Sequence, residues 1–329
     1  MSRRGRRHHE HSRKSRHNRR RRRWVVFFLF FACLLGLMGI PFLLSPEGEP
    51  VSRVKLPTMK AQPVPPQLST QLTARILQTR LEQVSAQYPG TYGVVVYDPS
   101  SGKTVTLNAD QRFVAASLSK LYALLTLYKA ASRGELSLDD EISMLPSDVQ
   151  PYGTGVLYKR PVGHTMTLRE CAEFMIKESD NTAWVMLNRY LGEEKIEAEL
   201  DRIGATSTAY WIPNTTTPND VLLVLKEIAD PSYTTPALSA EMLELMTNTS
   251  FEDRLPQPLP GGTRVAHKIG SYESTFSDAG IVFPEGRGGT NQEYYIVIFS
   301  EGVPEAEARE TIRDISQAAY RVLSRSDAP

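Results

Sequence analysis

Cysteine is nearly absent from this chain of 329 residues. The two cysteines are Cys33, in a long apolar stretch, and Cys171, in a segment with helical periodicity. A small domain stapled by disulfides needs several cysteines at close spacing, so this class is excluded. Cys171 is expected to be an ordinary buried helix residue. The fold must therefore depend on a hydrophobic core, for which the chain is long enough.

Histidine is scarce outside the N-terminal region. Four of the six histidines lie within residues 1–23, and only His164 and His267 remain for the rest of the chain. Two separated histidines argue against a histidine-rich metal site, and we predict neither a metal nor a cofactor. They also leave few candidates for the base of a Ser-His-Asp triad.

Acidic residues are almost missing from the first 23 positions. Residues 1–23 carry 12 of the 38 lysines and arginines and a single acid, Glu10. Residues 24–44 carry no charge, which leaves 26 basic and 36 acidic residues in the remainder, a net charge of −10. A basic arm and an acidic body are thus joined by an apolar segment.

The apolar segment 24–44 has the length of a membrane-spanning helix. Its 21 residues, at about 1.5 Å each, span roughly 30 Å, the thickness of a bilayer's hydrocarbon core. The adjacent arginines predict a cytoplasmic arm at 1–23 that contacts anionic lipids, a single-pass anchor in the cell membrane, and an extracytoplasmic body. A cleaved signal peptide, lipidation at Cys33, and nucleic-acid binding by the arm are the alternatives.

Proline and periodicity divide the rest of the chain. Six prolines in residues 45–67 predict an extended spacer, and residues 68–329 then form one folded domain. The domain opens with a helix at about 68–87. Its expected apolar face consists of Leu72, Ile76, Leu77, Leu81 and Val84.

Strand patterns occur near both ends of this domain. Two flank the turn 98–102, and three more, at 263–270, 276–284 and 293–300, precede a final helix from about Pro304. Helical segments fill the middle. The order predicts an α+β fold, with a five-stranded antiparallel sheet flanked by the terminal helices and a separate all-helical lobe.

One serine and one lysine stand where a loop leads into an apolar helix. Ser117 and Lys120 lie three residues apart, and on a helix they would share one face. Roughly one S-x-x-K match is expected by chance in a chain of this length, and Ser100 with Lys103 also matches, in a turn. A helix-capping serine with a solvated lysine is therefore the alternative for Ser117 and Lys120.

Two further elements favour a catalytic interpretation. The triplet Ser-Asp-Asn at 179–181 falls at a polar break between two helical segments. The tetrapeptide Lys-Ile-Gly-Ser at 268–271 follows a strand pattern, where Gly270 would otherwise mark a bulge. The three elements in this order are much rarer than any one of them alone.

With these motifs the chain resembles the penicillin-recognising serine hydrolases, specifically the class A β-lactamases, over about residues 68–325. The segment TTTPNDVLLVL, 215–225, resembles the stretch after their active-site omega loop. The resemblance implies the β-lactamase/D,D-peptidase fold and a β-lactam or acyl-D-amino-acid substrate. We expect a monomer.

The resemblance also implies the catalytic roles. Ser117 is the nucleophile, and Lys120, whose pKa an apolar enclosure would lower, is its base. Ser179 relays a proton to the leaving nitrogen. The backbone N–H groups of Ser117 and Ser271 form the oxyanion hole.

The same resemblance implies the substrate-binding roles. Asn181 binds the carbonyl of the substrate side chain, and Lys268, with Gly270 beside it, attracts the substrate carboxylate. His267 precedes Lys268 in a strand, so the two side chains point to opposite faces and His267 does not compete for the role of base.

The chain departs from the class A pattern in two places. The stretch 204–218 contains no Asp or Glu, whereas class A enzymes carry a glutamate there that activates the deacylating water. Ile269 also stands where a hydroxyl residue is usual. Acylation is therefore better supported by the sequence than turnover.

Three functional hypotheses follow. The first is a membrane-anchored serine hydrolase that opens β-lactam rings and releases the product slowly. The second is a D,D-peptidase or penicillin-binding protein that acts on the stem peptides of peptidoglycan. The third is a non-catalytic binding module on the same fold, against which the intact motif residues argue.

Overall fold

The computed structural model describes residues 66–284 and 293–324. The predicted arm, membrane segment and most of the spacer lie outside these residues. Within the described part of the chain, no helix is both long and apolar enough to cross a bilayer. The first described helix, α2, runs from Pro66 to Ser85, slightly before the predicted start of the domain at 68.

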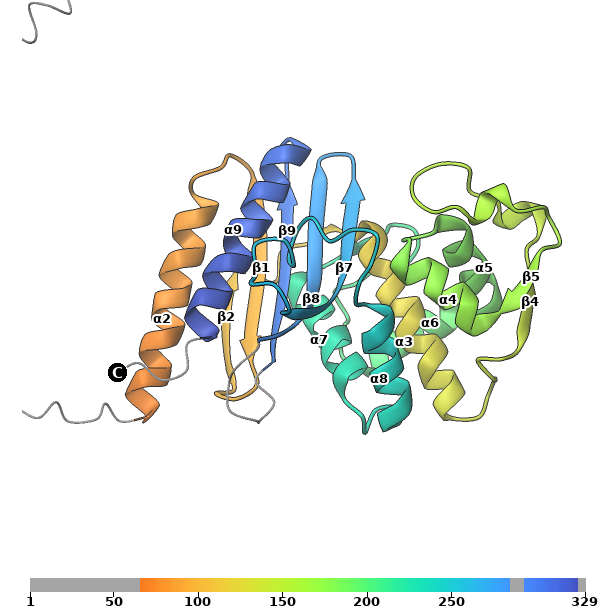
Figure 1. Ribbon diagram of the computed structural model, residues 1–329, viewed down its shortest axis with the longest axis horizontal. Helices are drawn as coiled ribbons and strands as arrows, with labels where there is room; N and C mark the ends of the chain where they lie inside the picture. The colour runs from red at the N-terminus through yellow and green to blue at the C-terminus, as the bar shows by residue number, and fades with distance from the viewer. Residues whose placement is uncertain (1–65, 285–292, 325–329) are drawn as a thin grey trace, which may run out of the picture. The chain divides into compact units, whose positions relative to one another are not determined.

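A five-stranded antiparallel sheet forms the centre of the domain (Figure 1). Its order is β2-β1-β9-β8-β7, so strands from both ends of the domain are neighbours, which confirms the predicted sheet. Their bounds are Thr91–Asp98 for β1, Lys103–Leu107 for β2, Arg264–Tyr272 for β7, Thr275–Phe283 for β8 and Tyr294–Glu301 for β9.

Helices cover both faces of the sheet. The terminal helices α2 and α9 (Glu305–Leu323) lie side by side over one face (Figure 1). Val94 and Val96 point into the core beneath them, and Val95, between the two, joins the core shared with the other helices. Because both faces are buried, the central strands read as nearly continuous apolar runs.

The predicted apolar face of α2 is only partly correct. Leu77 and Leu81 are buried against the sheet, but Leu72 and Ile76 are 54% and 44% exposed. A helix that packs on a sheet from one side buries a narrow stripe, and the two outer residues fall beyond it.

The remaining helices form a lobe around α3, and one of them, α7 (Pro218–Ala229), packs against β1 and β9 on the other face of the sheet (Figure 1). Most side chains of α3 are buried, including those of the polar residues Ser119, Lys120 and Thr126. The bounds are Ser119–Ser132 for α3, Leu168–Lys177 for α4, Asn181–Leu191 for α5, Glu193–Arg202 for α6, Pro218–Ala229 for α7 and Pro236–Leu245 for α8.

Short strand pairs connect the loops of this lobe. β4 (Glu141–Ser143) pairs with β5 (Thr165–Thr167), and β3 (Phe113–Val114) pairs with β6 (Thr215–Thr216). Segments of two or three residues carry no detectable periodicity, so they were not predicted. The β3–β6 pair joins the loop after α6 to the segment that leads into Ser117.

Candidate active site

Ser117 lies in a single 3₁₀ turn, η1 (Ala116–Leu118), directly before α3. Ser117 therefore precedes the helix, whereas the sequence suggested that the helix starts at Ser117. Ala116 adopts a left-handed φ of 49° and turns the chain so that Ser117 stands at the edge of a pocket. A strained backbone of this kind is often found at functional sites.

Lys120 connects the first two motifs. Its Nζ lies 3.0 Å from Oγ of Ser117, 2.6 Å from the main-chain oxygen of Ser179, 3.1 Å from Oγ of Ser179 and 2.7 Å from Oδ1 of Asn181. The structure thus brings together four of the residues that the sequence singled out. The nucleophile-to-base distance is within hydrogen-bond reach.

The surroundings of Lys120 favour its neutral form. Burial lowers its pKa well below the usual 10.5, the charge of Lys268 adds to this, and Asp180 opposes it. The two shortest contacts are to oxygens of Ser179 and Asn181 that can only accept. A neutral amine has two N–H groups for these oxygens and a lone pair left for a hydroxyl proton, which Ser117 is placed to donate.

The second S-x-x-K match has no such surroundings. Ser100 lies in the turn between β1 and β2, where its hydroxyl donates to Asp98 at 2.6 Å, and Lys103 is exposed. The helix and the burial distinguish the two matches, as the sequence context indicated.

The Ser-Asp-Asn triplet is held by its central residue. Asp180 caps α5 and accepts from the backbone N–H groups of Ala183, Val156 and Leu157 at 3.0, 2.6 and 2.8 Å. A side chain at Gly155 would place its Cβ 2.2 Å from the Asp180 carboxylate, so only glycine fits there. These contacts fix the turn on which Ser179, with a left-handed φ of 51°, reaches Lys120.

The third motif runs along β7. Lys268 is buried, and burial lowers its pKa from 10.5 to about 7, with Asp278 opposing and Arg254 adding to the shift. The alternative interpretation of Gly270, a β-bulge, does not hold, because the β7–β8 register is regular there. Glycine is needed for close approach, since a Cβ would lie 2.4 Å from Oγ of Ser277 and 3.0 Å from the carbonyl of Ala115.

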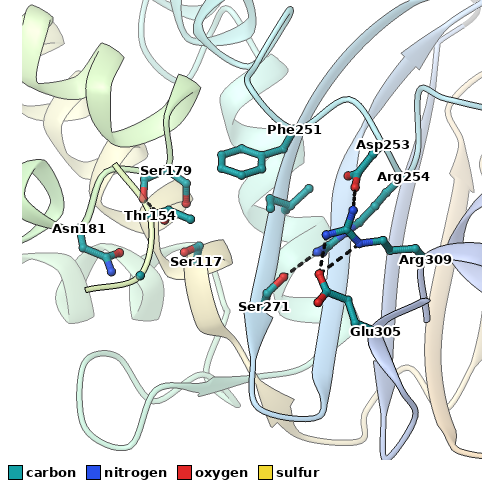
Figure 2. Close-up of a pocket in the computed structure, with 12 residues that line it drawn as sticks. Ser117, Thr154, Ser179, Asn181, Phe251, Asp253, Arg254, Ser271, Glu305 and Arg309 are labelled. Carbon is teal, nitrogen blue, oxygen red and sulfur yellow. Dashed lines mark hydrogen bonds and ion pairs between the residues drawn. The ribbon is translucent and has the colours of Figure 1, made fainter. Parts of the chain in front are cut away.

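A pocket of 260 Å³ opens between the helical lobe and β7 (Figure 2). Four of the predicted residues line it, while Lys120 and Lys268 are buried and are not among the lining residues. The lining comprises Ser117, Gly153, Thr154, Ser179, Asn181, Phe251, Asp253, Arg254, Ile269, Ser271, Glu305 and Arg309. Concave sites of this size with a few convergent polar groups commonly bind small molecules.

Arg254 is the main residue that the sequence analysis missed. Its guanidinium donates to the main-chain oxygens of Gly270 and Ser277 at 2.8 and 2.6 Å and to Oγ of Ser271 at 2.6 Å. It adds a fixed cation near Ser271 (Figure 2), on the side where Ile269 offers no hydroxyl. No motif or periodicity marks this residue, which lies in an irregular segment between α8 and β7.

His267 and Lys268 point to opposite faces of β7, as predicted, because the strand is regular at these residues. The buried ring contacts the carboxylates of Asp278 at 2.9 Å and Glu252 at 3.3 Å. Burial lowers its pKa, but the two carboxylates more than offset this and raise it from 6.5 to about 9. His267 is therefore a structural cation rather than a base for Ser117.

The other side of Ser117 faces the loop between α6 and α7. No Asp or Glu occurs in residues 204–217. Asn214 donates through Nδ2 to the carbonyl of Ala116 at 3.1 Å, while its Oδ1 is buried and has no hydrogen-bond partner among the described residues. Trp211 packs against Trp184, whose ring lies 5.6 Å from Nζ of Lys120.

Comparisons with known proteins identify the family. The chain matches the beta-lactamase enzyme family over residues 75–323. It is 28% identical over 270 residues to Beta-lactamase CTX-M-25 of Escherichia coli, which covers 76% of this chain and 89% of that protein. The chain therefore belongs to the β-lactamase enzyme family, and it is a class A β-lactamase-like serine hydrolase.

Solved structures show the same fold. The structure of PBP-A matches with a TM-score of 0.70 and 27% identity over 75% of this chain and 96% of that chain. A Leu-to-Glu mutant of PBP-A forms an acyl-enzyme complex with penicillin-G. An ancestral (GNCA) class A β-lactamase shares the fold with a TM-score of 0.69 and 24% identity, over 74% of this chain and 99% of that chain.

Proposed function

We propose that the protein opens β-lactam rings through an acyl-enzyme on Ser117 and hydrolyses this ester slowly. The observation that carries the proposal is the contact of Lys120 with Ser117 at 3.0 Å, in an environment that lowers the pKa of Lys120. A neutral lysine at this distance is a base for the serine hydroxyl.

Acylation then follows from the positions of the side chains. Oγ of Ser117 attacks the lactam carbonyl carbon, and its proton passes to Nζ of Lys120. The C–N bond of the ring breaks, and Ser179, 3.1 Å from Nζ of Lys120, returns a proton to the nitrogen. Asn181, Arg254 and Ser271 line the pocket and supply polar contacts for the rest of the substrate.

Deacylation lacks an equivalent base. Water must lose a proton as it attacks the ester, and the loop 204–217 offers no carboxylate to accept it. Oδ1 of Asn214 can accept a hydrogen bond from water but cannot take its proton. Lys120 remains as the base for both half-reactions, which accounts for slow release.

Mass spectrometry of the intact protein tests this proposal. Incubation with a penicillin should add one equivalent of mass, and the adduct should persist during turnover. Ser117→Ala should abolish the adduct, and Ser100→Ala, the matched change in the exposed turn, should leave it. Labelling that survives Ser117→Ala, or fast turnover without an adduct, would contradict the proposal.

A D,D-peptidase acting on peptidoglycan stem peptides is the second candidate. The missing carboxylate and the likeness to PBP-A favour it. Release of D-alanine from a peptide ending in D-Ala-D-Ala, measured beside penicillin hydrolysis, distinguishes the two. Faster peptide cleavage would make the peptidase the physiological activity.

We further propose that residues 24–44 anchor a monomeric enzyme in the cell membrane, with the basic arm at the cytoplasmic, anionic lipid surface. The support is the uncharged length of this segment and the arginines before it. Protease added to cells with a permeable outer layer should digest the body and leave the arm. Digestion only after lysis would contradict this topology.

A further inference from the structure

The N–H and the C=O of the peptide unit between Ala116 and Ser117 point in opposite directions. Its N–H belongs to the nucleophile, and its carbonyl belongs to Ala116. Because the peptide bond is planar and trans, whatever holds the carbonyl also fixes the direction of the N–H. The residues around the carbonyl therefore bear on how the N–H of Ser117 meets a substrate.

Three donors converge on the carbonyl of Ala116. They are the backbone N–H of Ser119, its Oγ at 2.7 Å, and Nδ2 of Asn214 at 3.1 Å. Ala116 has a left-handed φ of 49°, which a residue with a Cβ adopts only when its surroundings hold it. One helix residue and one loop residue thus stabilise this orientation.

Asn214 is placed by the last steps of a short ladder. Phe113 pairs with Thr216 and Val114 with Thr215. The N–H of Ala115 then donates to the main-chain oxygen of Asn214 at 3.0 Å. The side chain of Asn214 makes the next contact, on Ala116, so the loop follows the segment before Ser117 residue by residue.

We propose that Asn214 and Ser119 are positioning residues that aim the N–H of Ser117 at the substrate carbonyl. The inference rests on the proposed acyl-enzyme function. Hydrogen bonds to the carbonyl also polarise the peptide and strengthen its N–H as a donor. The loop 204–217, which has no base for deacylation, thereby contributes to acylation.

The test compares Asn214→Leu with Asn219→Leu in the full chain. The first change removes the donor to Ala116 at similar volume. The second removes a donor of the same kind, to Asp110 at 2.6 Å, at the start of α7. Penicillin acylation should slow about 10- to 100-fold in Asn214→Leu only, less than the ~10²–10³ for losing an oxyanion donor outright.

Infrared spectroscopy of the acyl-enzyme, with a ¹³C-labelled carbonyl, supplies a second readout. A poorly aimed N–H weakens the hydrogen bond to the ester carbonyl, so its stretching frequency should rise in Asn214→Leu and stay unchanged in Asn219→Leu. A general loosening of the fold would lower the melting temperature without this shift.

Ser119→Ala extends the test if Asn214→Leu does not fold, because it removes the 2.7 Å donor to the same carbonyl by deleting one oxygen. It should slow acylation and raise the frequency in the same way. Acylation within about twofold of wild type and an unchanged frequency in the folded variants would overturn the inference. Absence of any adduct in the wild type would instead overturn the proposed function.

Discussion

The residues on the two sides of Ser117 differ in structure and in chemistry. On one side Lys120, Ser179 and Asn181 form a buried network, fixed by two helices and by the carboxylate of Asp180. On the other side lies a loop without a carboxylate, held by backbone pairing and by Asn214. The first side has a base within reach of the nucleophile, and the second has none.

This difference indicates that the two half-reactions can change independently. In the proposed mechanism the base for Ser117 lies one turn along the same chain segment, at Lys120. A base for water must come from a separate loop, whose sequence can shorten without disturbing Lys120. Changes on each side should therefore affect different rate constants.

The largest expected effect is on the side of Lys120. Lys120→Met keeps the volume of the buried stem and removes the base, so acylation by a penicillin should slow by ~10²–10⁴-fold. Stopped-flow measurement of acylation checks this. Lys103→Met is the matched control, because Lys103 belongs to the other S-x-x-K match and is exposed. Equal rates in the two variants would remove Lys120 from the mechanism.

The next effect concerns the side that lacks a base. Ile212 is 86% exposed and follows Trp211, so a glutamate there costs no packing. Ile212→Glu should speed release of the acyl group by about 10-fold, below the ~10²–10⁴-fold of a well-placed general base, while acylation stays near wild type. Loss of the adduct mass over time measures it.

Ile212→Gln is the control for this change, since it has nearly the same shape and no basic oxygen. If it accelerates release as much as glutamate does, the loop limits deacylation through its conformation. The contrast between the two sides of Ser117 would then need another explanation.

The sequence predicted the secondary-structure elements around Ser117 better than it predicted the contacts between them. The sheet, the helix after Ser117 and the break at 179–181 follow from periodicity, which is a local property. The absence of an acid in 204–217 is visible without a structure. The apolar neighbours of Lys120 in the sequence indicated its burial, but its contact with Ser179 depends on the fold.

What the sequence missed depends on contacts between distant segments. Arg254 reaches Ser271 from an irregular segment, and Asn214 reaches Ala116 across 98 positions. The role of Gly270 depends on such contacts too, because the neighbours that leave no room for a Cβ are Ser277, on the paired strand, and Ala115, from another part of the chain. Periodicity carries no information about such pairs.

A smaller effect separates binding from chemistry on the β7 side of the pocket. Burial lowers the pKa of Lys268 to about 7, so its charge is present below that pH and lost above it. The rate of acylation by a penicillin, whose carboxylate Lys268 attracts, should fall as pH rises from 7 to 9. The fall should be only about tenfold, because Arg254 stays charged and still attracts the carboxylate. Titration of Lys120 changes the acylation rate in the opposite direction, since its neutral form is the base and is favoured as pH rises. The rate therefore has a rising limb due to Lys120 and a falling limb due to Lys268.

Lys268→Arg should remove the falling limb, because a guanidinium stays charged throughout this range. A penicillin methyl ester, which has no carboxylate, should show no such limb with the wild type. A limb that persists with the ester would have to come from a group other than Lys268.

The smallest effect on acylation is expected from His267, which points to the opposite face of β7 from Lys268 and contributes to stability. Its pKa is raised to about 9 in the folded protein, against 6.5 unfolded. The stability from its charged pair with Asp278 is therefore complete below pH 6.5 and lost as pH rises through about 9, and this pH-dependent part is about 3 kcal/mol.

The buried lysines change stability in the opposite direction over part of this range, so only the difference between wild type and His267→Gln isolates the pair. Denaturant unfolding at pH 6 and pH 10 should show a large difference at pH 6 that shrinks at pH 10, with acylation at pH 7 within about twofold. A difference independent of pH would mean that His267 is neutral in the fold.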